Sequence, residues 1–271
     1  MPLLELQGIS KRFGAVQALA GVDFEADRGE VVALVGDNGA GKSTLVKSIA
    51  GTHQPDEGRI VFDGQEVHIT DPQAATDLGI ATVYQDLALC DNLDAVANLY
   101  VGRERARGFG RNLRWLDEPA MEREAGQLLD RLSVGIPNLR QPVAALSGGQ
   151  RQSIAVARAT LGAPKLVMLD EPTAALGVAQ TRQVLELVRR LRDEGLAVVV
   201  ISHNLVDVFA VADRIVVLRL GRRVASFRAA DTTAEEVVAA ITGAESADVH
   251  ATYVPAGGDA SAATDPREAT S

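Results

Sequence analysis

Eight consecutive residues near the start of the chain have the types and spacing of a phosphate-binding loop. The segment Gly36–Ser43 reads GDNGAGKS and fits the pattern G-x-x-x-x-G-K-[ST]. Glycines let successive backbone N–H groups point at phosphate oxygens, Lys42 can reach the terminal phosphates, and the Ser43 hydroxyl can ligate Mg²⁺. A glycine-rich turn is the alternative, but the buried strand before the segment and the helix after it favour phosphate binding. The candidate residues are Gly36, Asp37, Asn38, Gly39, Ala40, Gly41, Lys42, Ser43 and Thr44.

Two adjacent carboxylates, Asp170 and Glu171, follow the apolar stretch Leu166–Leu169. At the edge of a parallel sheet, next to a phosphate-binding loop, the first acid would hold Mg²⁺ through water. The second acid could orient or deprotonate an attacking water. Many apolar strands end in acids, so a solvated strand end is the alternative, which the phosphate-binding loop makes the weaker one.

A third candidate is the string LSGGQ at Leu146–Gln150, which precedes a stretch with helical periodicity. Ser147 stands where the N-cap of that helix is expected. Gly148 and Gly149 expose backbone N–H groups at the helix N-terminus, which makes an anion-binding end. An ordinary capped helix is the alternative for this string taken alone.

Hydrophobic periodicity indicates the elements that must hold these residues. Val31–Val35, Lys165–Leu169 and Ala197–Ile201 are largely apolar runs, typical of strands buried on both faces. They alternate with helical stretches, so we expect an α/β fold with a mainly parallel sheet as its core. The N-terminal residues alternate apolar and polar side chains, which predicts an antiparallel β-subdomain. Helix formers dominate from about 87 to 161, which predicts a helical subdomain insert.

Composition excludes several classes of protein. The 271 residues carry 27 Lys and Arg against 36 Asp and Glu, a net charge of −9, so binding of long nucleic acids by charge alone is not expected. The longest apolar run, Leu196–Ile201, is far shorter than the ~20 residues of a membrane span, and the N-terminus has no secretory pattern. The single cysteine, Cys90, excludes an intrachain disulfide, suits a reducing compartment and is expected to be packed.

Two segments lie outside the motifs. The last 28 residues, Ala244–Ser271, contain no Leu, Ile or Phe and hold five acids and one base, which predicts a flexible acidic tail after a domain at 1–243. The stretch Val101–Trp115 holds five arginines, from Arg103 to Arg114, and one acid. A solvated loop is one interpretation, and contact with a membrane protein or anionic lipid headgroups is the other.

Four motifs together resemble the ATP-binding cassette (ABC) ATPases over about Leu3 to Gly243. They occur in the order GDNGAGKST, LSGGQ, LVMLDE and Ser202-His203 after a strand. The resemblance implies an ATPase that converts ATP and water into ADP and phosphate, with ATP and Mg²⁺ as its cofactors.

The resemblance also implies roles for single residues. Phe13 matches an aromatic position that stacks on adenine, Gln85 matches a glutamine that senses Mg²⁺ and the γ-phosphate, and His203 matches a histidine that contacts the γ-phosphate. Without the family, Gln85 would be a polar strand end and Phe13 a packed hairpin aromatic. The implied catalytic residues are Glu171, His203 and Lys42. The implied metal ligands are Ser43, Gln85 and Asp170. The implied nucleotide-binding residues are Phe13, the loop from Gly36 to Thr44, Gln85, Ser147, Gly148, Gly149 and Gln150.

A narrower resemblance is to the cassettes of bacterial ribose, xylose and fructose importers. It is carried by VYQDLALCDNLDAVANLYVGRE, EPTAALGV and ISHNLVDVFAVADRIVVLRLGR. It implies a peripheral subunit at the cytoplasmic face of the inner membrane that energises monosaccharide import. Its implied partners are transmembrane permease subunits and, indirectly, a sugar-binding protein. In the family, each ATP is enclosed between the phosphate-binding loop of one copy and the LSGGQ of another. A chain with one copy of each motif therefore predicts a head-to-tail homodimer.

The sequence departs from the family at one position, and it leaves two other classes of function to consider. Gly177 stands where most relatives have an aspartate, so contacts between copies through that loop are not specified. A soluble ABC ATPase acting on nucleic acid or ribosomes is the main alternative, although the coiled-coil insertion or basic extension common in such proteins is not seen. A P-loop kinase of another family is a third class, against which LSGGQ and His203 argue.

Overall fold

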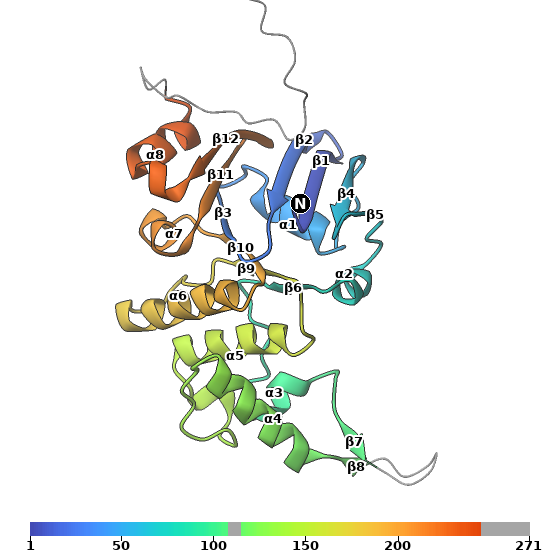
Figure 1. Ribbon diagram of the computed structural model, residues 1–271, viewed down its shortest axis with the longest axis vertical. Coiled ribbons are helices and arrows are strands. Elements are labelled where there is room, and N and C mark those ends of the chain that lie inside the picture. The colour runs from blue at the N-terminus through green and yellow to red at the C-terminus, as the bar shows by residue number, and fades with distance from the viewer. Residues whose placement is uncertain (108–114, 245–271) are drawn as a thin grey trace, which may run out of the picture.

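The computed structural model describes residues 1–107 and 115–244, and its core is a six-stranded sheet (Figure 1). Five of the strands are parallel, and the edge strand β12 is antiparallel to β11. The strands lie in the order β12 (Arg222–Arg228), β11 (Arg214–Arg219), β3 (Val31–Val35), β10 (Ala197–Ile201), β9 (Leu166–Asp170) and β6 (Ile80–Val83). The predicted α/β fold with a mainly parallel core is confirmed.

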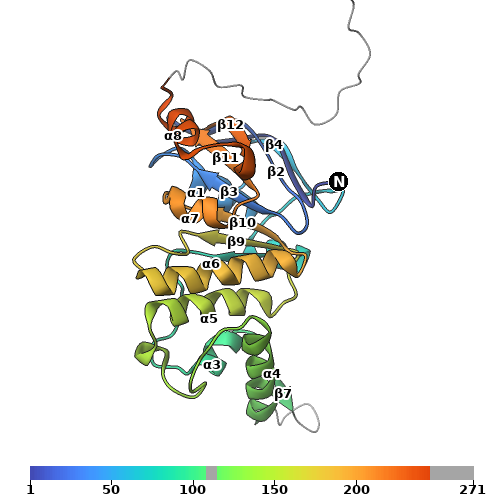
Figure 2. The same cartoon turned by 60° about the vertical axis from the view of Figure 1, so that its left-hand side comes forward.

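Helices cover both faces of this sheet, which is why its central strands are apolar throughout. Met168 and Val199 pack with α1 on one face, and Val167 and Val198 pack with α5 and α6 on the other. Both views show α5 and α6 on the side of the sheet opposite α1 (Figures 1 and 2). The α-helices of the described residues are α1 (Lys42–Ile49), α2 (Pro72–Leu78), α3 (Ala95–Tyr100), α4 (Glu118–Arg131), α5 (Gly148–Thr160), α6 (Val178–Asp193), α7 (Leu205–Val211) and α8 (Ala234–Thr242).

The predicted antiparallel β-subdomain is a four-stranded sheet. Its order is β2 (Val16–Ala26), β1 (Leu4–Phe13), β4 (Glu57–Phe62) and β5 (Gln65–Val67), and every pair is antiparallel. Leu6 and Phe24 face each other across β1 and β2, and both are buried in the cluster that contains α1. The N-terminal alternation therefore marks residues that pack against the phosphate-loop helix.

Helices α3, α4 and α5 occupy the end of the molecule farthest from the antiparallel sheet (Figure 1). Two very short strands, β7 (Ala106–Arg107) and β8 (Trp115–Leu116), also pair there, which the composition does not predict. Cys90 is exposed, so its prediction as a packed side chain is wrong. The side chain of Asn98, which is fully buried, binds the N–H and the carbonyl of Cys90 and so holds the backbone, leaving the thiol outside.

Two predictions fall outside this description. The tail predicted for 244–271 lies beyond the described residues except for Ala244, and Arg111 and Arg114 of the arginine-rich stretch also lie outside them.

Candidate active site

The strand order places four candidate loops in one row. Parallel strands end at the same edge of a sheet, and β3, β10, β9 and β6 are successive neighbours. The loop after β3 is the phosphate-binding segment, β10 leads to His203, β9 leads to Glu171, and Gln85 follows β6 by two residues. Candidate residues separated by up to 167 positions in the chain, from Gly36 to His203, are thus gathered along one edge.

The phosphate-binding loop needs glycine at two positions for reasons of space. Gly36 has φ +147°, and a Cβ there would lie 2.1 Å from the carbonyl oxygen of Leu218. Gly41 has φ +103°, and its Cβ would lie 2.7 Å from the carbonyl oxygen of Ala18. The loop is therefore wedged between β11 and β2, while the residues at its tip, Asp37 to Gly39, are exposed. Their backbone amides can meet an incoming anion.

Lys42 folds back over this loop. Its Nζ donates hydrogen bonds to the carbonyl oxygens of Gly36, at 2.6 Å, and Asp37, at 3.0 Å. Burial lowers the pKa of Lys42, and the nearby charges of Glu171, Asp37 and Asp170 oppose that shift. The lysine therefore lies among the carboxylates of the site. Its ammonium group can exchange the loop carbonyls for phosphate oxygens as hydrogen-bond acceptors when a ligand binds.

Asp170 and Glu171 differ in environment although they are adjacent. Burial raises the pKa of Asp170, the charge of Glu171 raises it further, and Lys42 and Lys47 act in the opposite direction. Glu171 has φ +51°, an uncommon conformation for a residue with a side chain. Its backbone N–H donates to the carbonyl of Ile201 at 2.9 Å, which ties the end of β9 to the end of β10.

Glu171 and His203 are in direct contact. The Nδ1 atom of His203 lies 2.9 Å from each carboxylate oxygen of Glu171. The glutamate side chain is 16% exposed and the histidine side chain 73% exposed. A mostly enclosed carboxylate thus faces an imidazole that is open to solvent, an arrangement that can orient a water molecule and contact a ligand.

LSGGQ begins α5 as predicted, with Ser147 as the N-cap. Ser147 Oγ accepts from the Gln150 N–H at 3.3 Å, and the Ser147 N–H donates to Gln150 Oε1 at 3.0 Å, a capping box. Ser147 and Gly148 are exposed, whereas Gly149 is buried against Gln180. Because α5 covers the face of the sheet opposite α1, the structure does not bring this motif to the phosphate-binding loop of the same chain.

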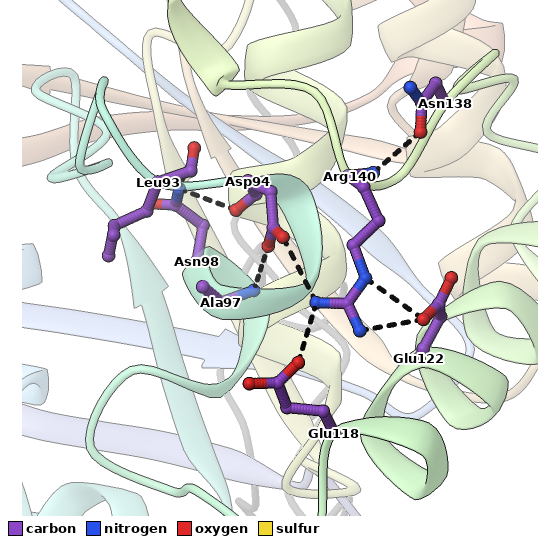
Figure 3. Close-up of polar contacts among 8 residues, drawn as sticks. All are labelled: Leu93, Asp94, Ala97, Asn98, Glu118, Glu122, Asn138 and Arg140. Atoms are coloured by element: carbon purple, nitrogen blue, oxygen red, sulfur yellow. Dashed lines mark hydrogen bonds and ion pairs between the residues drawn. The ribbon is translucent and has the colours of Figure 1, made fainter. Parts of the chain in front are cut away.

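Ion pairs that the sequence did not predict hold the segment leading to LSGGQ. Arg140 donates to Glu122 at 2.8 and 3.0 Å and to Asp94 at 3.3 Å, and lies 3.4 Å from Glu118 (Figure 3). Asp94 also caps α3 by accepting from the Ala97 N–H at 2.7 Å. One arginine therefore joins the start of α3, the helix α4 and the chain before the motif. An arginine six residues before LSGGQ is the only sequence signal for it.

Gln85 and Phe13 are both exposed. Gln85 is exposed, and a groove of about 250 Å³ passes beside it, lined by Tyr84, Asp86 and Leu87 and by residues of α3 and α5. Phe13 is 44% exposed at the end of β1, and its ring meets His53 edge-on, with centroids 5.2 Å apart and planes at 71°. Its predicted stacking on adenine, like the other ligand contacts assigned to single residues, stays a prediction.

The family follows once these parts are considered together. Residues 19–174 match the family described as ABC transporter. The chain belongs to the ABC transporter family. It is an ATP-binding ATPase of that family, so the predicted recognition and enzyme class are confirmed. None of the helices in the described residues is long and apolar enough to cross a bilayer.

Several curated relatives are close in sequence. The xylose/arabinose import ATP-binding protein of Sulfolobus acidocaldarius is 47% identical over 240 residues, which cover 89% of this chain and 94% of that protein. The fructose import ATP-binding protein of Rhizobium meliloti is 48% identical, covering 90% of this chain and 95% of that protein. A ribose import ATP-binding protein of Rubrobacter xylanophilus is 44% identical, but the match covers only 47% of its length.

Solved cassettes share the fold. An ATP-binding cassette of an ABC transporter in its ADP conformation superposes with a TM-score of 0.76 at 27% identity, covering 89% of this chain and 95% of that one. A dimeric cassette in a post-hydrolysis state, bound to ADP and phosphate, superposes with a TM-score of 0.68 at 25% identity, covering 83% and 98%.

Proposed function

We propose that this chain is the ATP-hydrolysing subunit of a membrane importer for a monosaccharide. The observation that carries the proposal is the row of loops at the sheet edge, where Lys42, Glu171 and His203 come from three adjacent strands. The names of the xylose/arabinose and fructose relatives, which match this chain over nearly their whole length, support sugar import. No feature of the described residues favours a nucleic-acid or ribosome-associated ATPase over this function.

The residues of the edge divide the work of hydrolysis. Backbone amides of the phosphate-binding loop and the ammonium of Lys42 hold the β- and γ-phosphates. Glu171 orients and activates the water that attacks in line, and His203 positions the Glu171 carboxylate and contacts the γ-phosphate. Charge stabilisation and positioning supply most of the catalysis, because phosphoryl transfer requires little covalent participation from the protein.

A magnesium ion fits the oxygen donors at this edge. Ser43 offers a hydroxyl at the start of α1, Asp170 a half-buried carboxylate, and Gln85 an exposed amide oxygen. These are hard oxygen ligands, of the kind that Mg²⁺ takes together with substrate phosphates. The bound ion would neutralise charge on the phosphates, and its positive charge would favour ionised Asp170 despite the burial of that side chain.

The site is completed by a second copy of the chain. Ser147 and Gly148 are exposed at the N-terminus of α5, on the opposite side of the sheet from α1, so they can meet only the γ-phosphate bound by another molecule. In a head-to-tail homodimer, the LSGGQ of each copy completes the ATP site of the other, which gives two equivalent sites. Gly177 caps α6 without a side chain, so contacts between copies at that loop involve backbone atoms or the exposed Val178.

The groove beside Gln85 is the proposed docking site for the permease. It lies between the loop after β6 and the helices α3 and α5, so a permease segment seated there would touch both the loop that carries Gln85 and the helix that begins with LSGGQ. Closure of the ATP-bound dimer would then move the permease. In this proposal the chain is a peripheral subunit on the cytoplasmic side of the membrane, and a sugar-binding protein acts from the other side.

Reconstitution tests the proposal. The chain, its permease and its binding protein in proteoliposomes should take up labelled xylose, ribose or fructose when ATP is present on the side of the cassette. The variant Glu171→Gln should assemble equally well and import nothing. ATP hydrolysis that is stimulated by DNA, RNA or ribosomes, and not by permease with sugar, would contradict the import function while leaving the ATPase intact.

A further inference from the structure

The loop that carries Glu171 has a strained backbone. Glu171 adopts φ +51°, a left-handed conformation that is strained for a residue with a Cβ and must be compensated by its surroundings. Two backbone hydrogen bonds hold the loop, from the Glu171 N–H to the Ile201 carbonyl and from the Ala174 N–H to the Glu171 carbonyl. Neither of these bonds fixes the direction of the Glu171 side chain, so a further restraint is needed to aim its carboxylate.

The neighbouring loop, which carries His203, is joined rigidly to α7. Ser202 is buried, and its hydroxyl accepts from the Asn204 N–H at 3.0 Å. Asn204 is the N-cap of α7, and its side chain accepts from the Val206 N–H at 3.0 Å. His203 therefore moves with the first turn of α7.

A buried hydrogen bond joins these two loops behind the reacting groups. The Thr173 hydroxyl donates to Asp207 Oδ2 at 2.6 Å, and the two residues are only 8% and 7% exposed. Asp207 lies in the first turn of α7, four residues after His203, and Thr173 lies two residues after Glu171. The two loops are therefore joined by two side-chain contacts, one between Thr173 and Asp207 and one between Glu171 and His203.

We propose that Thr173 and Asp207 are positioning residues for hydrolysis, which aim the Glu171 carboxylate through this buried bond. They touch neither nucleotide nor attacking water. A short bond between a hydroxyl and a buried carboxylate is stronger than a neutral one, so it can hold the strained Glu171 backbone in a single orientation against His203. The inference rests on the proposed role of Glu171 as the residue that activates water.

The test compares Thr173→Val, which has the same shape without the hydroxyl, with Thr173→Ser, which keeps the hydroxyl. Phosphate release should show kcat lowered about 10- to 30-fold in Thr173→Val, with the Kd for ATP within about twofold of the parent. Thr173→Ser should restore most of the rate, and Asp207→Asn should lose less than Thr173→Val because its amide oxygen still accepts. Thr160→Val is the matched control, since it also removes a buried hydroxyl hydrogen bond, to the Ala157 carbonyl at 2.8 Å, and kcat should not change.

Measuring Thr173→Val in a chain that already carries Glu171→Gln distinguishes a positioning role of Thr173 from a general effect on structure. There, adding Thr173→Val should change the residual rate by less than about twofold, because no catalytic carboxylate is left to aim. A normal kcat in Thr173→Val with an inactive Glu171→Gln would overturn the inference alone. An equal loss in both backgrounds, or a loss of ATP affinity that parallels kcat, would overturn it too. Normal turnover in Glu171→Gln would instead overturn the role of Glu171 on which the inference rests.

Discussion

Replacing Gly36 by alanine tests the packing of the phosphate-binding loop quantitatively. The added Cβ would lie 2.1 Å from the Leu218 carbonyl oxygen, whereas real contacts of this kind stay above 3.0 Å, so the loop and β11 must separate by about 0.9 Å. The separation is resisted because β11 is paired with β3 in register, with Val217 opposite Val35. A positive φ of 147° adds about 1–3 kcal/mol of backbone strain.

The steric overlap costs about a further 1–3 kcal/mol, so the total loss in the free energy of unfolding is about 4 kcal/mol, which for a chain of this size lowers Tm by about 8–16 °C. Gly39→Ala is the matched control in the same loop. It also has a positive φ, +81°, but its Cβ would meet no atom within 4 Å, so only about 1–2 kcal/mol of strain is expected.

Thermal unfolding followed by circular dichroism, without nucleotide, measures both variants. Titration with a fluorescent ATP analogue should then show weaker binding by Gly36→Ala, because the loop amides have moved with the backbone. Equal Tm values for Gly36→Ala and Gly39→Ala would contradict this expectation. They would mean that the Leu218 carbonyl moves away from the added Cβ with no loss in the free energy of unfolding.

Four further changes have definite expectations. Glu171→Gln should keep ATP affinity, lower kcat about 100-fold or more, and accumulate as an ATP-bound dimer in size-exclusion chromatography, whereas a monomer with normal phosphate release would contradict the role of the carboxylate. Lys42→Ala should weaken ATP binding about 100-fold without lowering Tm, because burial already disfavours its charge, and calorimetric titration measures the affinity. Asp170→Asn should raise Tm at pH 7 while impairing Mg²⁺-dependent hydrolysis. Burial raises the pKa of Asp170, so its ionisation above that pKa opposes folding, and the Tm advantage should shrink as the pH falls toward the ordinary pKa of an aspartate. Asn98→Ala should lower the free energy of unfolding by about 2–4 kcal/mol in urea, because its buried amide binds Cys90, Leu93 and Asp94 backbone atoms, and an unchanged midpoint would show that water replaces these bonds.

Local chemistry made some parts of the site predictable and left others hidden. The run Val31–Val35 followed by Gly36 specifies a buried strand and a loop without further information, and Ser147 is a recognisable N-cap. In contrast, β6 ends at Val83, before the Gln85 that was expected to end it, because Val83 is the last residue paired with β9. The backbone of Cys90 is held by Asn98, and β7 pairs with β8; these are contacts between separate segments, which the periodicity of a single helix or strand does not report.

The amino-acid sequence by itself predicted which residues carry chemistry, because glycines, a lysine and adjacent carboxylates act through properties that each motif holds within a few residues. Tertiary structure decided which motifs meet. The crossover connections place β10 between β3 and β9, so His203 reaches Glu171, although 32 positions separate them. The same connections send α5 to the opposite face of the sheet from α1, which separates LSGGQ from the phosphate-binding loop. Strand order follows from long-range packing of two apolar faces, and no local pattern encodes it.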